Sequence, residues 1–89
     1  MAGPTMQEIG RVSGFFVKPS VAVVELTADV TVGESVYIKG HTTDLLQVLE
    51  SMQVDRQPVS VARAGQSVGL KVHDRCRRHD VVYRVVESS

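Results

Sequence analysis

The sequence predicts an all-β fold, a single small closed antiparallel β-barrel. Apolar residues alternate with polar ones in several short runs, which is the period-2 pattern of strands with one buried face. Glycine and proline turn signals separate the runs, and no alternation of strands with helices is present. The chain has 89 residues, enough for one hydrophobic core. A barrel is favoured at this size because closing the sheet removes its exposed edges.

The first two strands are predicted on either side of Pro19. Residues 9–17 form the first apolar run, and strand pairing is expected to stop at Pro19 because proline fixes φ and has no N–H to donate. Residues 21–26 form the second run, in which the even-numbered residues share one face. This second strand is expected to be buried along much of its length.

Two glycine turns each precede another predicted strand. Gly33 and Gly65 lie in similar short turns, where glycine adopts a positive φ without steric cost. Residues 35–39 follow the first turn and residues 67–72 follow the second, and in both runs the even-numbered positions are apolar and expected to face inward. Residues 81–86 are rich in β-branched side chains and form the last predicted strand.

Residues 43–54 are ambiguous from local pattern alone. Asp44 could cap a helix, and the leucines that follow lie near helical spacing. Read as a strand, the segment places four apolar residues on one face, namely Leu46, Val48, Met52 and Val54. Local periodicity does not decide between these two structures.

Composition restricts the class of protein. The single cysteine, Cys76, excludes a disulfide within the chain, and no basic stretch leads into a long apolar run. The longest apolar stretch, residues 21–24, is far shorter than the roughly 20 residues that cross a bilayer. We therefore expect a cytoplasmic protein with no membrane association.

The charges are distributed unevenly, although their sum is zero. Residues 1–55 carry three basic and seven acidic side chains, whereas residues 56–84 carry seven basic and two acidic ones. Three of these arginines fall within residues 75–78, where guanidinium groups able to match phosphates are dense. The C-terminal half is thus a candidate surface for structured RNA, or else a solvated loop.

Two segments carry a family resemblance. Residues 32–40 (VGESVYIKG) and 64–70 (AGQSVGL) resemble, in this order, turn-and-strand segments in domain two of elongation factor Tu and related translational GTPases. The resemblance covers residues 9–86 and implies a barrel of the translation-protein domain 2 type, with a strand through the ambiguous segment. It also implies a flexible N-terminus at residues 1–8 and a tail at residues 87–89.

The chain looks most similar to small stand-alone translation elongation factor-like proteins, whose barrel is also appended to some collagenase-like peptidases. The closer match rests on Phe16, the strand at residues 21–26 and residues 39–44 and 51–53. Gly10 and Arg11 stand where the family has an acidic pair for the aminoacyl end of transfer RNA, which puts that recognition in doubt. No phosphate-binding loop ending in Gly-Lys-Ser/Thr occurs, so neither GTP nor another nucleotide cofactor is expected.

Catalytic and metal sites are not predicted. His41, His73 and His79 have neither the spacing of a metal-binding helix nor cysteine partners, and are expected in turns or on the surface. Arginines beside Cys76 would lower the pKa of an exposed thiol, but no base can be assigned to it, so an inert or redox-sensitive cysteine is favoured.

The predicted function is that of a non-catalytic module, without cofactor, that docks transfer or ribosomal RNA. Its candidate contacts are Arg11, Lys71, His73, Arg75, Arg77 and Arg78. Of the adjacent Phe15 and Phe16, one is expected to face inward, and the other is free to stack on a base or to contact a partner. The alternative is a protein-interaction or accessory barrel that partners an enzyme such as a collagenase-like peptidase. A small hydrolase is a third, less favoured hypothesis.

Overall fold

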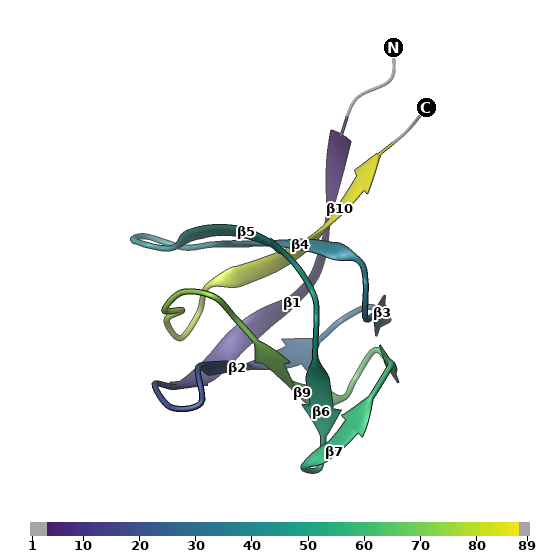
Figure 1. The fold of residues 1–89 in the computed structure, drawn as a ribbon. Helices are drawn as coiled ribbons and strands as arrows, with labels where there is room; N and C mark the ends of the chain where they lie inside the picture. The colour runs from purple at the N-terminus through teal and green to yellow at the C-terminus, as the bar shows by residue number, and fades with distance from the viewer. Residues whose placement is uncertain (1–3, 88–89) are drawn as a thin grey trace.

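The computed structural model describes residues 4–87 and contains only strands and their connections. Ten strands follow one another along the chain (Figure 1). Their bounds are β1 Pro4–Phe16, β2 Val21–Leu26, β3 Val30–Thr31, β4 Ser35–Lys39, β5 Asp44–Val48, β6 Met52–Val54, β7 Gln57–Val59, β8 Val61–Ala62, β9 Ser67–Lys71 and β10 Val81–Glu87. The all-β prediction is confirmed. None of the residues that the structure describes belongs to a helix able to cross a membrane.

Eight strands form one antiparallel sheet in the order β5-β4-β10-β1-β2-β9-β6-β7, and β3 pairs with β8 in a small second sheet. The predicted closed barrel is wrong in one respect, because the end strands β5 and β7 are not hydrogen-bonded to each other. The short strand β7 contains Pro58, which has no N–H to donate, and among the described strands it pairs with β6 alone.

The ambiguous segment is extended, as the family resemblance implied, but its predicted faces are partly wrong. Leu46 and Val48 are exposed, while Gln47 between them is buried. The side-chain amide of Gln47 donates to Lys71 O (3.0 Å), and its Oε1 accepts from His73 N (2.8 Å). A buried polar side chain is tolerated when it is hydrogen-bonded in this way. Gln47 therefore faces inward, and its apolar neighbours Leu46 and Val48 face outward.

The two predicted glycine turns are confirmed. Gly33 has φ 102° and Gly65 has φ 90°. Each turn is completed by a side chain three residues on: Glu34 accepts from Thr31 N, and Gln66 accepts from Arg63 N, both at 2.7 Å. Seven apolar residues of β2, β4, β9 and β10 centre the core and are all buried. They are Val24, Leu26, Val36, Ile38, Val68, Leu70 and Val82.

The two ends of the described chain run side by side. Pro4 pairs with Glu87 and Thr5 with Val86, so β1 and β10 extend together beyond the body of the fold (Figure 1). Strand β1 therefore begins five residues before the first predicted strand at Ile9. Residues 1–3 and 88–89 lie outside the described residues, and the predicted division into flexible N-terminus, barrel and tail stays a prediction.

Candidate functional site

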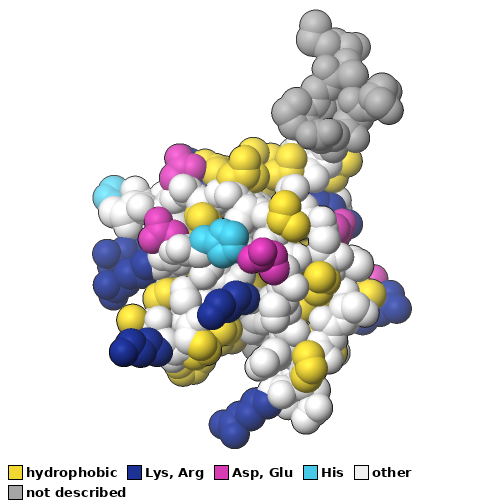
Figure 2. Space-filling model, in the orientation of Figure 1, with side chains coloured by type: hydrophobic (Ala, Val, Ile, Leu, Met, Phe, Trp, Pro, Cys, Tyr) yellow, Lys and Arg dark blue, Asp and Glu magenta, His cyan; other side chains and the backbone are white. Residues whose placement is uncertain are grey.

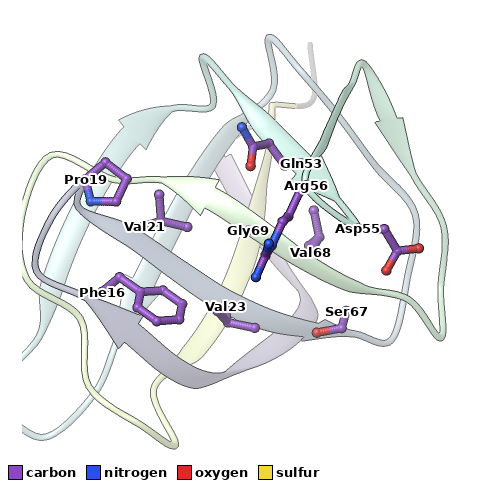
Figure 3. Close-up of a pocket in the computed structure, with 10 residues that line it drawn as sticks. All are labelled: Phe16, Pro19, Val21, Val23, Gln53, Asp55, Arg56, Ser67, Val68 and Gly69. Carbon is purple, nitrogen blue, oxygen red and sulfur yellow. The ribbon is translucent and has the colours of Figure 1, made fainter.

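An open groove crosses the outer face of β2, β9 and β6 (Figure 3). Its main hollow has a volume of about 320 Å³, and a second hollow of about 200 Å³ continues it along the same strands. The two hollows share four residues. These are Pro19, Val21, Gln53 and Gly69.

The groove exists because Gly69 has no side chain. In the sheet register Gly69 lies between Val23 of β2 and Gln53 of β6, so a side chain there would stand on the groove floor. A Cβ placed on Gly69 would lie 3.0 Å from Val21 Cγ1. The half-buried side chains of Val21 and Val23 supply the apolar part of the floor.

Phe16 and Arg56 border the groove. The Phe16 side chain is 59% exposed at the end of β1, which leaves a large aromatic surface uncovered. Arg56 stands in the turn between β6 and β7 with φ 64°, and it lines the same hollow as Gly69 (Figure 3). Among residues 4–87 no carboxylate lies within ion-pair distance of Arg56. The groove thus combines an apolar floor with a cation that is free to meet an anionic group.

A basic side adjoins this groove. The connection between β9 and β10 exposes Arg75, Arg77 and Arg78, as predicted. Lys71 at the end of β9 and Lys18 in the turn after β1 are exposed as well. Lys71 Nζ donates to the carbonyl oxygen of Pro19, which joins the end of β9 to the turn after β1. In Figure 2 lysine and arginine side chains gather on the side of the molecule formed by these two connections.

Buried residues hold the β9–β10 connection in place. His79 N donates to Val12 O and Val12 N donates to Asp80 O, both at 2.8 Å, so the connection continues the pairing with β1. The buried carboxylate of Asp80 accepts from Arg77 N at 2.8 Å. The arginines are therefore carried by a loop with a defined backbone, and their side chains are exposed.

The Cys76 thiol lies inside this loop, where it is 1% exposed. Burial raises the pKa of Cys76 to about 11, and the carboxylates of Asp80 and Asp74 add to the shift. The flanking arginines therefore do not activate the thiol, because the side chain faces the core. Within the described part of the chain no group of three histidine, cysteine or acidic side chains is placed to hold a metal ion.

The structure brings together only part of the predicted RNA-contacting set. Arg11 and Arg78 line one hollow of about 400 Å³, and Arg78 Nε donates to Ser13 O at 3.0 Å. Lys71 lines the groove instead. His73 Nε2 lies 2.7 Å from Glu50 Oε1, so this ring nitrogen already has an acidic side chain as its partner. The assignment of these residues to nucleic-acid binding stays a prediction.

Sequence reasoning missed Gly69 and Arg56 as groove residues. A lone glycine between Val68 and Leu70 interrupts a strand pattern, which is a signal for a close approach or a surface depression. No comparable signal marks Arg56, because its position over the groove depends on the pairing of β6 with β9. Of the phenylalanine pair, in which one side chain was expected to face inward, Phe15 packs against the core and Phe16 is the exposed member.

The chain is similar in sequence to two proteases. It is 40% identical over 82 residues to an uncharacterized protease of Methanocaldococcus jannaschii, a match that covers 91% of this chain and 20% of that protein. It is 30% identical over 87 residues to a collagenase of Porphyromonas gingivalis, covering 93% of this chain and 21% of the collagenase. The chain thus spans about a fifth of the length of these relatives. No family model matches it.

The chain also resembles solved structures of a peptidase domain. The C-terminal domain of a Geobacillus thermoleovorans protein described as a U32 peptidase superimposes with a TM-score of 0.80 and 22% identity, covering 85% of this chain and 96% of that domain. A second structure of the same domain gives a TM-score of 0.79. At this identity the likeness establishes the fold.

These findings correct the resemblance to translation factors. The relatives and the structural neighbours are proteases and a peptidase C-terminal domain, and not domain two of elongation factor Tu. The interpretation failed because the motifs that carried it are short glycine turns between valine-rich strands, which many unrelated β proteins use.

Proposed function

We propose that this chain is a non-catalytic accessory module that works beside a peptidase-type domain. The module contributes binding surfaces, and the partner carries the chemistry. One observation carries the proposal: 82 residues, covering 91% of the chain, match a fifth of a protease at 40% identity. The likeness in fold to a peptidase C-terminal domain supports it.

The side chains of the module fit a binding role. The one thiol is buried and its pKa is raised, which keeps it protonated and a poor nucleophile near neutral pH. The groove over Gly69 offers an apolar floor beside Arg56, which suits recognition of an extended segment better than bond cleavage.

The test is complex formation between purified chains. The module is mixed with a peptidase-type chain from the same organism that resembles the remaining part of the proteases above, and the mixture is examined by size-exclusion chromatography with light scattering. A complex with a one-to-one mass is expected, with peptide hydrolysis by the peptidase-type chain and none by the module. Hydrolysis by the module alone, or the absence of a complex at micromolar concentrations, would contradict the proposal.

Docking of structured RNA by the basic side is a second candidate function. The observation that favours it is the set of three exposed arginines on one ordered loop, none of which has a carboxylate within ion-pair distance among the described residues. Replacing Arg75, Arg77 and Arg78 with alanine is expected to weaken binding to transfer RNA and to flatten its salt dependence, because fewer counterions are released. An unchanged salt slope would rule out this loop as the RNA site.

A further inference from the structure

The outer face of β5, β4, β10 and β1 carries an apolar surface away from the groove. We call it the β5 face. It consists of Met6, Tyr37, Leu46, Val48, Tyr83 and Val85. Leu46 is 63% exposed, Met6 is 51% exposed and Val48 is 50% exposed. Figure 2 shows hydrophobic side chains along the upper surface, over the strands that Figure 1 labels β5 and β4.

The sheet register places these side chains on one face. Leu46 pairs with Tyr37, and Tyr37 pairs with Tyr83, so the three stand in a row across β5, β4 and β10. The two tyrosine rings have centroids 6.4 Å apart. Val48 lies two residues along β5, and the pair of Met6 with Val85 lies two residues along β1 and β10, so both belong to the same face.

Strand β5 also ends the sheet. Only β4 pairs with it among the described strands, so the backbone along its other side is available to a partner. An apolar face beside a free strand edge, bordered by the charged side chains of Lys39, Asp44 and Glu8, has the make-up of a protein interface.

The position of the β5 face identifies its occupant. Met6 lies near the N-terminal end of the described chain, where β1 and β10 extend beyond the body. The matching structures are C-terminal domains, so in such proteins the peptidase part precedes the equivalent of β1. Four fifths of the length of the related proteases lies outside the matched segment. A domain attached there is next to the β5 face and remote from β6 and β7.

We propose that the β5 face is the surface on which the peptidase-type domain docks. The inference rests on the proposed function and adds its location: aromatic and aliphatic side chains of the β5 face are buried against an apolar surface of that domain. The groove and the basic side then stay exposed in the complex and available to a ligand.

The test compares two matched double variants. Leu46→Asp with Val48→Asp places charge on the β5 face. Val17→Asp with Val61→Asp makes the same change at side chains that are 68% and 39% exposed but lie outside both this face and the groove. The dissociation constant of each variant for the peptidase-type chain is measured by calorimetry, after circular dichroism has confirmed the fold. Leu46→Ser is a milder variant if the double aspartate variant does not fold.

The β5 variant is expected to bind about 100-fold more weakly, and the control within about threefold of the parent, since buried apolar side chains at an interface centre dominate affinity. Equal affinity of the β5 variant and the parent would overturn this inference and leave the proposed function standing. Absence of binding by the parent would overturn the proposed function itself. A parent that dimerises through Leu46 and Val48 and excludes the peptidase-type chain would assign the face to a second copy, and would also overturn the inference.

Discussion

The side chain of Gln47 is hydrogen-bonded to the backbone of His73, with Oε1 accepting from the amide nitrogen at 2.8 Å. Its Nε2 donates to Lys71 O at 3.0 Å. These bonds link β5 to the end of β9, although the two strands are not neighbours in the sheet. Gln47 thereby joins through a side chain two parts of the sheet that backbone pairing leaves apart.

Replacing Gln47 with alanine is expected to reduce the free energy of unfolding by about 1–3 kcal/mol, because the partly buried carbonyl of Lys71 and amide of His73 lose their partner. Urea denaturation measures the change. Gln53→Ala is the matched control, since Gln53 is exposed on β6 and is expected to change stability by less than about 0.5 kcal/mol. Equal effects of the two substitutions would show that the Gln47 bonds contribute nothing.

Gly40→Ala is expected to destabilise the fold by about 2 kcal/mol or more. A Cβ on Gly40 would overlap Oδ1 of Asp80. That carboxylate is buried and accepts from Arg77 N, so it cannot move without losing a hydrogen bond. Gly14→Ala is the control, because nothing lies within 4 Å of the equivalent Cβ. Thermal melting of the two variants should separate them, and a shared melting temperature would contradict the contact.

Asp29 is expected to make stability depend on pH. Hydrogen bonds from Ala64 N, and then from Arg63, lower the pKa of Asp29 below its usual value. A carboxyl group whose pKa is lower in the folded state stabilises the fold above its unfolded pKa of about 3.9, and this contribution is lost as pH falls through the folded pKa. The difference in unfolding free energy between the parent and Asp29→Asn should therefore be larger at pH 7 than at pH 2.

Asp55→Asn serves as the control for this series, because no hydrogen bond to the Asp55 carboxylate is present among the described residues. A difference for Asp29→Asn that stays constant over the same range would show that the bonds to Ala64 and Arg63 do not favour the charged form.

Cys76 is expected to resist alkylation in the folded protein. Its pKa of about 11 leaves very little thiolate at pH 8, and the side chain is buried. Labelling by iodoacetamide, followed by mass spectrometry, should be slow in buffer and fast in urea. Rapid labelling of the folded chain would show that the β9–β10 connection opens.

Much of the fold could be predicted because alternation and turn glycines act locally. The even-numbered apolar residues of β2, β4 and β9 are buried as expected. In β5 the same rule failed, since the burial of Gln47 depends on Lys71 and His73, which lie 24 and 26 residues further along the chain. No pattern within the strand reveals such partners.

The candidate surfaces were less predictable for a related reason. The exposed arginines could be predicted because alternation stops where the β9–β10 connection begins. The groove could not, since Gly69, Val21 and Gln53 come from three strands whose pairing is a property of the tertiary structure. The β5 face was hidden because Leu46 and Val48 were grouped on one strand face with Met52 and Val54, whereas Leu46 and Val48 are exposed and Met52 is buried.

Hydrogen exchange of the module with the peptidase-type chain present tests the central claim most directly. Backbone amides of β4, β5 and β10 should exchange more slowly in the mixture than in the free module, with the largest change at Leu46 and its neighbours, while the β9–β10 connection should be unchanged. Exchange that is identical with and without the peptidase-type chain, together with protection of residues 72–80 by transfer RNA, would contradict the accessory role and favour the RNA-docking function.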